Sequence, residues 1–525
     1  MHRNILFLSR YLLPNNVSVC TVRRFLNKSP GNEQMEYLKS AINTNFQDWP
    51  VLKDNILSKD GSVNENNVDA VILKTMVRNQ KLDSASSFAN YLKSSASVLS
   101  IGATNSILGL YYEKGKNKSL SPSEKQFILN TFIDLYNKYK VLDYSTSESL
   151  LHALCAIDEW EKALKVLDDL KLSCTPSHSA YSTLIGTLFK NNKVKEALDM
   201  INRSVSDLRP LQDYAYKEWM NYYLRKYKNK GTIIKHLDTI CSHITKNCAV
   251  ISMATADEMI KTYSLLGWNA EFVEVIKQSG QCMSCNKTLK CLKLSIEEFE
   301  LLQKNIKDKL IIGSDMFLKT SPKELNEFLH FVDETAPYDI VLDALNIAYA
   351  VSKRSNMEKV QFLKTVVDYF NGKNKKILLL GRKHMLKWHR KTLEYLMCRT
   401  CSFFTEDMSQ DDPFFITAAI MSGPHTDIVS KDLLRGHRFL LKDQTLKLLF
   451  QKWQWQHQWK VFLAGRRPII QPPLQFTPCA QKNQDGWHLP YEKEEKTAFG
   501  EKPQVNDGVP SYDGWLCLRP KIVIK

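Results

Sequence analysis

Four aspartates stand where a predicted element ends or begins, and acidic side chains in such places can bind metal ions. They are Asp343, Asp411, Asp412 and Asp432. The first closes a predicted strand, the next two precede a predicted helix, and the last lies two residues beyond another predicted strand. Clustered carboxylates repel one another unless cations neutralise them, and their hard oxygen atoms suit Mg²⁺ or Mn²⁺. Ions held in this way can activate water and stabilise the leaving oxygen in phosphodiester hydrolysis.

Each aspartate also has an ordinary structural alternative. Asp411 or Asp412 is alternatively the N-cap of the helix that starts near Pro413, although a cap can also bind metal. Asp432 is alternatively a surface loop residue. Asp343 is the hardest of the four to explain without a ligand, because an acid at the end of a buried strand requires a partner.

Two cysteine pairs have the spacing of metal ligands, namely Cys282/Cys285 and Cys398/Cys401. A structural zinc site needs four ligands, so each pair alone is incomplete. The second pair runs from a predicted helix end into a predicted strand, and we interpret it as ordinary buried thiols. Twelve cysteines in 525 residues are too sparse for a disulfide scaffold.

The chain from about residue 336 alternates between predicted strands and predicted helices, which favours an α/β domain with a parallel sheet. The predicted strands are 338–343, 376–381, 402–405 and 427–430, and the predicted helices are 357–370, 382–397 and 413–422. A largely helical stretch follows to about Trp459, and the chain after about 466 is proline-rich and irregular. Ligands of such sheets bind beyond the carboxyl ends of the strands, where the four aspartates are expected.

The segment 64–265 has helical periodicity throughout, and part of it repeats. Leu151, Leu154, Ala163, Leu164 and Pro176 are matched by Ile185, Leu188, Ala197, Leu198 and Pro210, each 34 residues later (185 − 151). A fixed period of this length with two helices per unit predicts an α-solenoid. The alternative is a plain helical bundle.

The balance of charge points to a polyanionic partner. Lysine and arginine number 72 against 56 acids, which gives a formal net charge of +16 and a pI of about 9.1. Such an excess favours nucleic acid binding. No apolar run approaches the roughly 20 residues of a membrane span.

The first residues have the composition of a mitochondrial transit peptide. Five basic residues precede the first acid, Glu33, and apolar residues are interleaved among them. An arginine-rich, acid-free, amphipathic start is typical of import into the mitochondrial matrix, whereas a secretory signal would have one compact apolar core. The alternative is a disordered basic tail.

Three acidic motifs resemble the protein-only ribonuclease P family. They are Ile340-Val-Leu-Asp343-Ala-Leu-Asn346, Ser409-Gln-Asp-Asp-Pro-Phe, and Ser430-Lys-Asp432-Leu-Leu-Arg-Gly-His437. They are similar to the NYN/PIN-like α/β metallonuclease domain of that family. The resemblance implies that Asp343, Asp411, Asp412 and Asp432 are catalytic and hold magnesium or manganese, with Asn346 in support.

Two positions depart from the pattern of the family. Ala344 replaces the usual glycine after the first aspartate, which is tolerable if its backbone angle is ordinary. Gly436 replaces an aspartate that often precedes the histidine at position 437, which puts the contribution of that position in doubt.

The family resemblance extends to a structural zinc site. The arrangement Cys282-Met-Ser-Cys285, Trp487-His488 and Trp515-Leu-Cys517 is similar to that of the family. It implies that Cys282, Cys285, His488 and Cys517 bind Zn²⁺ as a closed structural site. The nuclease segment lies between the second and third ligands in the sequence. Zinc would therefore join the chain segment that precedes the nuclease segment to the one that follows it.

The helical repeats resemble pentatricopeptide repeats. The unit Tyr181-Ser-Thr-Leu-Ile-Gly is followed by Lys193-Val-Lys-Glu-Ala-Leu and then Pro210. This resemblance implies RNA binding on the repeat surface. The predicted organisation is a multidomain α plus α/β protein: residues 1–45 form a transit peptide and disordered lead-in, 46–270 a pentatricopeptide-repeat α-solenoid, 271–300 with 470–525 a split zinc-stabilised central domain, and 301–469 the NYN metallonuclease domain.

The resemblance implies an endoribonuclease that removes the 5′ leader from precursor tRNA and leaves a 5′-phosphate on the tRNA. The nuclease and C-terminal segments look more like the animal mitochondrial form than the plant form. That likeness implies a tRNA methyltransferase and a short-chain dehydrogenase as partners. The alternatives are a non-catalytic mitochondrial RNA-binding factor and a nuclease of the same fold that acts on other RNA.

Overall fold

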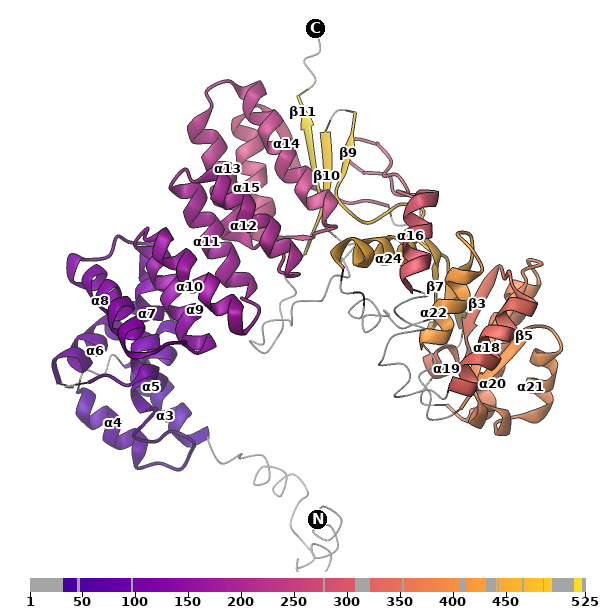
Figure 1. Ribbon diagram of the computed structural model, residues 1–525, viewed down its shortest axis with the longest axis horizontal. Helices are drawn as coiled ribbons and strands as arrows, with labels where there is room; N and C mark the ends of the chain where they lie inside the picture. Colours follow the sequence, from indigo (N-terminus) through magenta and orange to yellow (C-terminus); the bar gives the residue numbers. More distant parts are fainter. Residues whose placement is uncertain are drawn as a thin grey trace, which may run out of the picture. The chain divides into compact units, whose positions relative to one another are not determined.

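The structure is a computed structural model that describes residues 32–44, 48–95, 98–276, 279–306, 322–351, 354–406, 412–430, 441, 443–464, 467–484, 486–492 and 514–521. The chain divides into two compact units, Met1–Trp219 and Met220–Lys525, and Figure 1 labels many of their elements. None of the described helices is both long and apolar enough to cross a membrane.

The regular elements described in the first unit are all helices. They are α3 (Asn32–Asn43), α4 (Trp49–Leu57), α5 (Val68–Arg78), α6 (Leu82–Ser95), α7 (Ile101–Gly115), α8 (Pro122–Lys138), α9 (Tyr144–Ala156), α10 (Trp160–Ser173), α11 (His178–Lys190), α12 (Val194–Ser206) and α13 (Asp213–Lys226), which continues into the second unit. Side chains before several helices satisfy the first backbone N–H groups. Ser121 and Glu124, for example, form a reciprocal capping box at the start of α8.

The expectation of a disordered lead-in up to residue 45 is corrected at its end, because α3 is folded against the unit. Gln34, near its start, is buried and accepts a hydrogen bond from the backbone N of Val63 at 2.8 Å. Its amide nitrogen donates to the carbonyl of Ile56 at 3.1 Å. Residues 1–31, which include the predicted transit peptide, lie outside the described residues.

The predicted 34-residue repeat is confirmed by the pairs α9–α10 and α11–α12, whose corresponding helices have equivalent boundaries. Asp143 and Ser177 occupy equivalent N-cap positions and accept from backbone N–H groups three residues later. Asp158 and Asn192 take equivalent left-handed conformations in the turns, with φ of 62° and 60°. Leu151, Leu154, Ile185 and Leu188 of the repeated positions are fully buried, as a stacked solenoid requires, whereas Leu198 is 42% exposed.

The second unit begins with α14 (Lys230–Lys246), β1 (Ile251–Ser252), α15 (Met253–Leu265) and β2 (Trp268–Val273). These elements meet the C-terminal strands β9 (Gln481–Asn483), β10 (Gly486–Glu492) and β11 (Trp515–Pro520). The strand order is β1-β10-β11-β2, with β9 paired to β10. Segments far apart in the sequence therefore share one small sheet. The described part of the C-terminal segment forms strands, although the sequence there appeared irregular.

A six-stranded sheet forms the second half of this unit, in the order β5-β4-β3-β6-β7-β8. The strands are β3 (Ile340–Asp343), β4 (Ile377–Arg382), β5 (Cys401–Thr405), β6 (Asp427–Val429), β7 (Gln458–Ala464) and β8 (Arg467–Gln471). The first five are parallel, and β8 returns antiparallel to β7. The four predicted strands are confirmed, together with the parallel α/β class.

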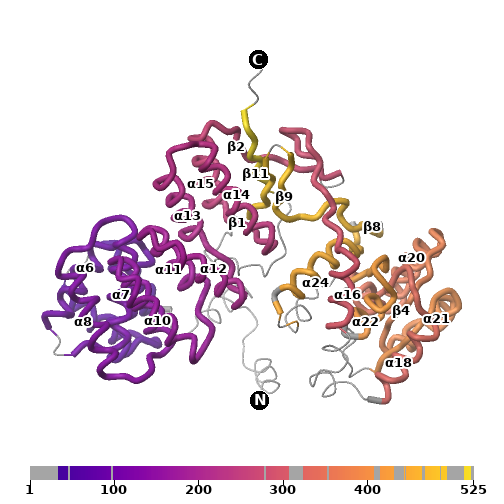
Figure 2. Tube along the Cα trace, turned by 45° about the horizontal axis from the view of Figure 1, so that its top comes forward, coloured from indigo at the N-terminus to yellow at the C-terminus, as the bar shows by residue number. Residues whose placement is uncertain are grey.

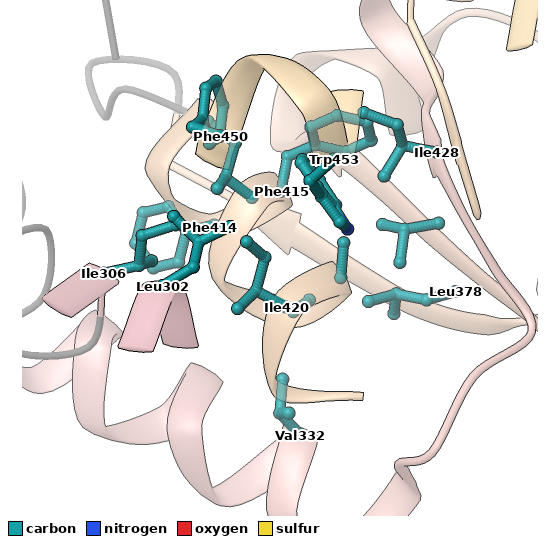
Figure 3. Packing of buried hydrophobic residues seen from close by; sticks show 14 of the residues in the cluster. Leu302, Ile306, Val332, Leu378, Phe414, Phe415, Ile420, Ile428, Phe450 and Trp453 are labelled. Carbon is teal, nitrogen blue, oxygen red and sulfur yellow. The ribbon is translucent and has the colours of Figure 1, made fainter. Parts of the chain in front are cut away.

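Helices cover both faces of this sheet (Figure 2). One face carries α16 (Ile296–Ile306), α18 (Pro322–Thr335), α22 (Asp412–Met421) and α24 (Gln444–His457), and the other carries α19 (Ala344–Ala348), α20 (Asn356–Asn371) and α21 (Arg390–Met397). Alternate residues of β3 supply the two cores. Trp453, which is fully buried, packs with Phe415 and Ile428 on the first face (Figure 3).

Two predicted helices differ from the observed elements. The helix expected over 382–397 is divided into the 3₁₀ turn η3 (Lys383–Lys387) and α21, because His389 between them is extended with φ of −152°. The helical stretch expected to reach Trp459 ends at His457. Gln458 and Trp459 instead pair with Ile428 and Val429 of β6, so pairing in the sheet overrides local helical periodicity.

Candidate metal centres

The carboxyl edge of the six-stranded sheet positions Asp343. This residue ends β3, is 7% exposed, and caps α19 by accepting a hydrogen bond from the backbone N of Asn346 at 2.9 Å. Its second carboxylate oxygen accepts from the hydroxyl of Ser430 at 3.4 Å. Because β3 and β6 are adjacent and parallel, Asp343 and Ser430 lie at the same edge. The buried acid is thus fixed at the place where α/β sheets bind ligands.

The other three predicted ligands are described only in part. The backbone of Asp412 opens α22, so this residue is the first of the helix rather than a residue before it. Asp411 and Asp432 lie outside the described residues, as does Gly436. Asp432 follows Ser430 by two positions in the sequence, and Ser430 lies beside Asp343.

Ser430 is a site residue to which sequence reasoning gave no role. It is fully buried, and its carbonyl accepts a hydrogen bond from the side-chain amide of Gln458 at 2.8 Å. This bond holds the end of β6, from which the chain continues towards Asp432. The available signal was its position at the end of a predicted strand, directly before the acidic motif.

Two aspartates at the opposite edge of the same sheet have structural partners. Asp339 precedes β3 and accepts from the backbone N of Lys376 at 2.7 Å. Asp427 begins β6 and accepts from Trp459 Nε1 at 2.8 Å, while its other oxygen lies 3.1 Å from His457 Nδ1. These bonds join neighbouring strands, so the acids at this edge are accounted for by the fold.

Ala344, which departs from the glycine of the family pattern, is the first residue of α19 and is fully buried. It is not among the described residues with positive φ. A helical backbone accepts alanine at least as well as glycine. The backbone angle at Ala344 is therefore an ordinary one, and alanine is tolerated at this position.

The second centre brings together Cys282, Cys285, His488 and Cys517. One ligand atom from each lies within 4.8 Å of the others, and three of the four residues are buried. Cys285 Sγ is 3.3 Å from His488 Nε2. We call this group the sulfur cluster; within the described chain it is the one group of three or more His, Cys, Asp or Glu residues close enough to share a metal ion.

The local structure explains how ligands so far apart in the sequence meet. His488 and Cys517 face each other in the antiparallel pair β10–β11. Cys282 and Cys285 form a tight turn, in which the N of Asn286 donates to the carbonyl of Cys282 at 3.0 Å. Asn286 has a φ of 58°, a left-handed conformation that asparagine tolerates. Gln481 then fixes the loop, because its side chain both donates to and accepts from the backbone of Lys290 at 2.8 Å.

Hydrogen bonds and burial within the sulfur cluster shift the pKa values of its thiols in different directions. A hydrogen bond from the Cys517 thiol lowers the pKa of Cys282, which favours the thiolate form of this sulfur. The same bond raises the pKa of Cys517, and burial raises the pKa of Cys285. Thiolate sulfur and neutral imidazole are the donors that zinc prefers.

The geometry of the sulfur cluster fits a tetrahedral zinc ion. Bonds of about 2.3 Å to sulfur and about 2.0 Å to nitrogen place tetrahedral ligand atoms roughly 3.5–3.8 Å apart. Cys285 Sγ and His488 Nε2 are 3.3 Å apart, and no two of the four ligand atoms are more than 4.8 Å apart, so small adjustments of the side chains would give this spacing. The side-chain amide of Asn483 lies 3.0 Å from His488 Nδ1. With its oxygen turned towards Nδ1, this amide would accept from the Nδ1–H of an imidazole that binds zinc through Nε2, and so orient the ring.

The other cysteine pair does not belong to this cluster. Cys401 begins β5 and is partly buried, whereas Cys398 is exposed at the end of α21. The prediction that both thiols are buried is therefore wrong for Cys398. The helix ends there and turns towards the strand, which leaves its last side chains in solvent.

Comparison with known proteins assigns the chain to a family. Residues 276–517 match the family model of protein-only RNase P, and residues 145–174 and 179–207 match pentatricopeptide repeats. The chain is 33% identical over 405 residues to the mitochondrial ribonuclease P catalytic subunit of Rattus norvegicus and 32% identical to that of Mus musculus. Each alignment covers 74% of this chain and 66% of the relative, so the chain spans just under two thirds of these relatives.

The fold is also that of a solved structure, nuclear proteinaceous RNase P 2 of Arabidopsis thaliana. The TM-score is 0.56 at 16% identity, and the match covers 87% of this chain and 100% of that one. At this identity the likeness concerns the fold. Together with the family model and the rodent relatives, it leads to one assignment: the chain belongs to the protein-only ribonuclease P family.

Proposed function

We propose that the chain is the catalytic subunit of a mitochondrial ribonuclease P, an endoribonuclease that removes the 5′ leader of precursor tRNA. In this reaction water attacks the phosphorus that joins leader to tRNA. The bond to the 3′ oxygen of the leader breaks, and that oxygen takes up a proton. The products are a leader with a 3′-hydroxyl and a tRNA with a 5′-phosphate.

The single observation that supports this proposal most is the placement of Asp343. A buried carboxylate that ends a parallel strand, held by the backbone N of Asn346 and the hydroxyl of Ser430, is oriented before substrate arrives. The helix α22, which begins at Asp412, packs on the face of the same sheet. We propose that Asp343, Asp411, Asp412 and Asp432 together hold magnesium or manganese, which when bound activates water and stabilises the leaving oxygen.

We further propose that the sulfur cluster binds zinc in a structural role. All four donor atoms come from the protein, so no position remains open for substrate. Cys285 and His488 are 203 residues apart and flank the six-stranded sheet in the sequence. Zinc would therefore fix the entry and exit of the nuclease segment to the small sheet.

The repeats and the charge support RNA as the substrate. Pentatricopeptide repeats precede the nuclease segment, and the chain carries a formal charge of +16. The names of the rodent relatives, together with the arginine-rich first residues, support a location in mitochondria and more finely in the matrix. A tRNA methyltransferase and a short-chain dehydrogenase are the proposed partner subunits.

The test is cleavage of a 5′-labelled mitochondrial precursor tRNA with Mg²⁺, with and without the two proposed partner proteins. The wild-type chain and Asp412→Asn are compared. We expect a single cut at the mature 5′ end by the wild type and none by the variant. A requirement for the added proteins would identify them as partners.

Other outcomes would favour the alternatives. Scattered cuts in many RNAs would indicate a nuclease of the same fold with a different substrate. Retained RNA binding with no cleavage under any condition would indicate a non-catalytic RNA-binding factor.

A further inference from the structure

Four side chains form an aromatic and cationic group on the α20 side of the six-stranded sheet. We call Tyr349, Lys359, His384 and Trp388 the aromatic cluster. The rings of Tyr349 and Trp388 meet edge to face, with centroids 6.0 Å apart, and the His384 ring lies 5.6 Å from that of Trp388. The ammonium group of Lys359 lies 4.2 Å from the centroid of Tyr349 and 5.6 Å from that of Trp388.

The topology places this cluster at the same edge of the sheet as Asp343. Tyr349 begins the short turn η2 (Tyr349–Val351) that follows β3 and α19, and His384 and Trp388 follow the end of β4. Lys359 lies in the first turn of α20, which connects the parallel neighbours β3 and β4 and must therefore run back across the sheet. The first turn of such a helix lies at the carboxyl edge of the strands, beside the proposed catalytic acids.

Lys359 is the most unusual member of the cluster. The residue is 7% exposed, yet no carboxylate of the described chain forms an ion pair with it. A charged group removed from water is costly unless it is paired, and aromatic faces compensate only part of that cost. A mostly buried lysine with no acidic partner among the described residues, at an edge where phosphodiester chemistry is proposed, favours an anionic ligand such as a phosphate.

Tyr349 adds a surface on which a base can stack. The residue is 45% exposed although its ring contacts Trp388 and Lys359. Aromatic rings beside cations are the usual platform for unpaired nucleotides. The tRNA nucleotide on one side of the cleaved bond belongs to a paired stem, whereas the leader nucleotide on the other side is single-stranded and has free faces.

We propose that the aromatic cluster binds the last nucleotide of the leader, with the base stacked on Tyr349 and a backbone phosphate near Lys359. The inference rests on the proposed function, since it assigns a contact of that substrate. Bound in this way, the leader strand is held away from the paired stem, and the scissile phosphate lies between the cluster and Asp343. The cluster would therefore set how strongly cleavage depends on the leader base.

A second group of the same composition provides a matched control at the other end of α20. Tyr369 and Trp459 have centroids 6.2 Å apart, and Lys373 lies 4.4 Å and 5.3 Å from these two rings. Tyr369 lies in the last turn of α20, and Trp459 is the second residue of β7, so this group lies at the amino edge of the strands. Its aromatic and lysine contacts are similar, but it is remote from Asp343.

The test compares a precursor tRNA whose last leader nucleotide is intact with one in which that nucleotide is abasic. Single-turnover cleavage is measured in Mg²⁺, and RNA binding is measured in the Asp343→Asn background. We expect the wild type to cleave the abasic precursor roughly tenfold more slowly, within the range for loss of one base–aromatic stack. Tyr349→Leu should cleave the intact precursor as slowly as the wild type cleaves the abasic one. It should cleave its own abasic precursor no more slowly than the intact one. Tyr349→Phe and the control Tyr369→Leu should behave as the wild type does.

A second variant tests the phosphate contact. Lys359→Met removes the charge and keeps an unbranched apolar side chain among the rings. The logarithm of the RNA-binding constant falls linearly with the logarithm of the salt concentration. In Lys359→Met we expect the magnitude of this slope to decrease by about one unit, as for one lost phosphate contact. Lys373→Met should leave the slope unchanged.

The outcomes separate this inference from the proposed function. If Tyr349→Leu still discriminates tenfold between the two precursors, or if the wild type does not discriminate at all, the inference is overturned. The wild type could instead cut neither precursor, yet bind the intact one more tightly than the abasic one, with Tyr349→Leu abolishing that difference. This result would support the contact with the leader nucleotide and contradict the proposed nuclease activity.

Discussion

The sulfur cluster and the carboxyl edge of the nuclease sheet differ in how many of their proposed metal ligands are held by regular structure. The cluster takes its four donors from a tight turn and from two paired strands, and these donors already lie within 4.8 Å of one another. At the carboxyl edge, only Asp343 is fixed within a strand. Of its proposed companions, Asp412 begins α22, and in the sequence Asp411 directly precedes that helix and Asp432 follows β6.

This difference fits two kinds of metal chemistry. A closed set of sulfur and nitrogen donors leaves no room for substrate and therefore stabilises the fold. Carboxylates at the edge of a sheet face the region where ligands bind, and oxygen donors leave coordination positions to water and phosphate. Loss of the first centre should mainly reduce stability, and loss of the second should mainly reduce cleavage.

The largest expected effect is on catalysis and comes from Asp343→Asn. Asparagine keeps an oxygen that can accept the hydrogen bond from Asn346, so the cap of α19 is preserved and the free energy of unfolding should change by less than about 1 kcal/mol. Loss of the negative charge should lower the single-turnover cleavage rate on the order of 10³-fold, which corresponds to roughly 4 kcal/mol of activation free energy.

Asp339→Asn is the matched control, because Asp339 lies at the opposite end of the same strand, where its carboxylate accepts from the backbone N of Lys376 and pairs with the ammonium group of Lys375 at 3.7 Å. Its cleavage rate should stay within a few-fold of the wild type. Equal losses in the two variants would show that charge at the carboxyl edge has no special role.

The next largest effect is on stability and comes from Cys517→Ser. Serine is a poor ligand for zinc, because its hydroxyl oxygen replaces one of the three sulfur donors of the cluster. Bound zinc, measured by elemental analysis, should fall below one ion per chain, and the free energy of unfolding should decrease by roughly 3 kcal/mol.

Cys398→Ser provides the control for this variant, because Cys398 is exposed and lies outside the sulfur cluster. It should change neither zinc content nor the midpoint of thermal unfolding. Cys517→Ser protein with full zinc content would contradict the assignment of its sulfur as a ligand.

A smaller effect should come from Asn483→Ala, which tests support of the sulfur cluster from outside its ligands. The amide of Asn483 lies 3.0 Å from His488 Nδ1 and orients the ring whose Nε2 faces Cys285. Loss of such an outer contact typically weakens metal binding by about 10–100-fold. Competition with a zinc-binding dye should show this weakening, whereas an unchanged affinity would mean that strand pairing alone orients His488.

Sequence reasoning succeeded where the determining pattern is local. The apolar runs of β3 and β4 predicted these strands to within two positions at either end. The repeated pattern at 151–210 predicted the 34-residue period of α9–α12, with two helices per unit. The strand that contains Trp459 was missed because its conformation is set by pairing with Val429, a contact across the fold that no local pattern encodes.

The sites show the same division. The first zinc pair was visible as a local spacing, but His488 and Cys517 could be added only through family resemblance, because their register in β10–β11 is a tertiary property. Ser430 and Lys359 escaped notice for a related reason. Ser430 is an ordinary residue at the end of a strand, and its importance comes from its burial beside Asp343. Lys359 lies on a helix with several charged residues, and its importance comes from its position near the rings of Tyr349 and Trp388.

The smallest expected effect concerns the departure of this chain from its family at Ala344. As the first residue of α19, Ala344 has a helical backbone and a buried methyl group, so glycine there would lose packing and gain freedom in the unfolded chain. Ala344→Gly should therefore lower the free energy of unfolding by about 1 kcal/mol or less and leave the cleavage rate within a few-fold of the wild type. Chemical denaturation and single-turnover cleavage would measure the two quantities separately. A large gain in cleavage would instead mean that alanine displaces Asp343, and that the carboxyl edge is less well ordered for catalysis than its hydrogen bonds suggest.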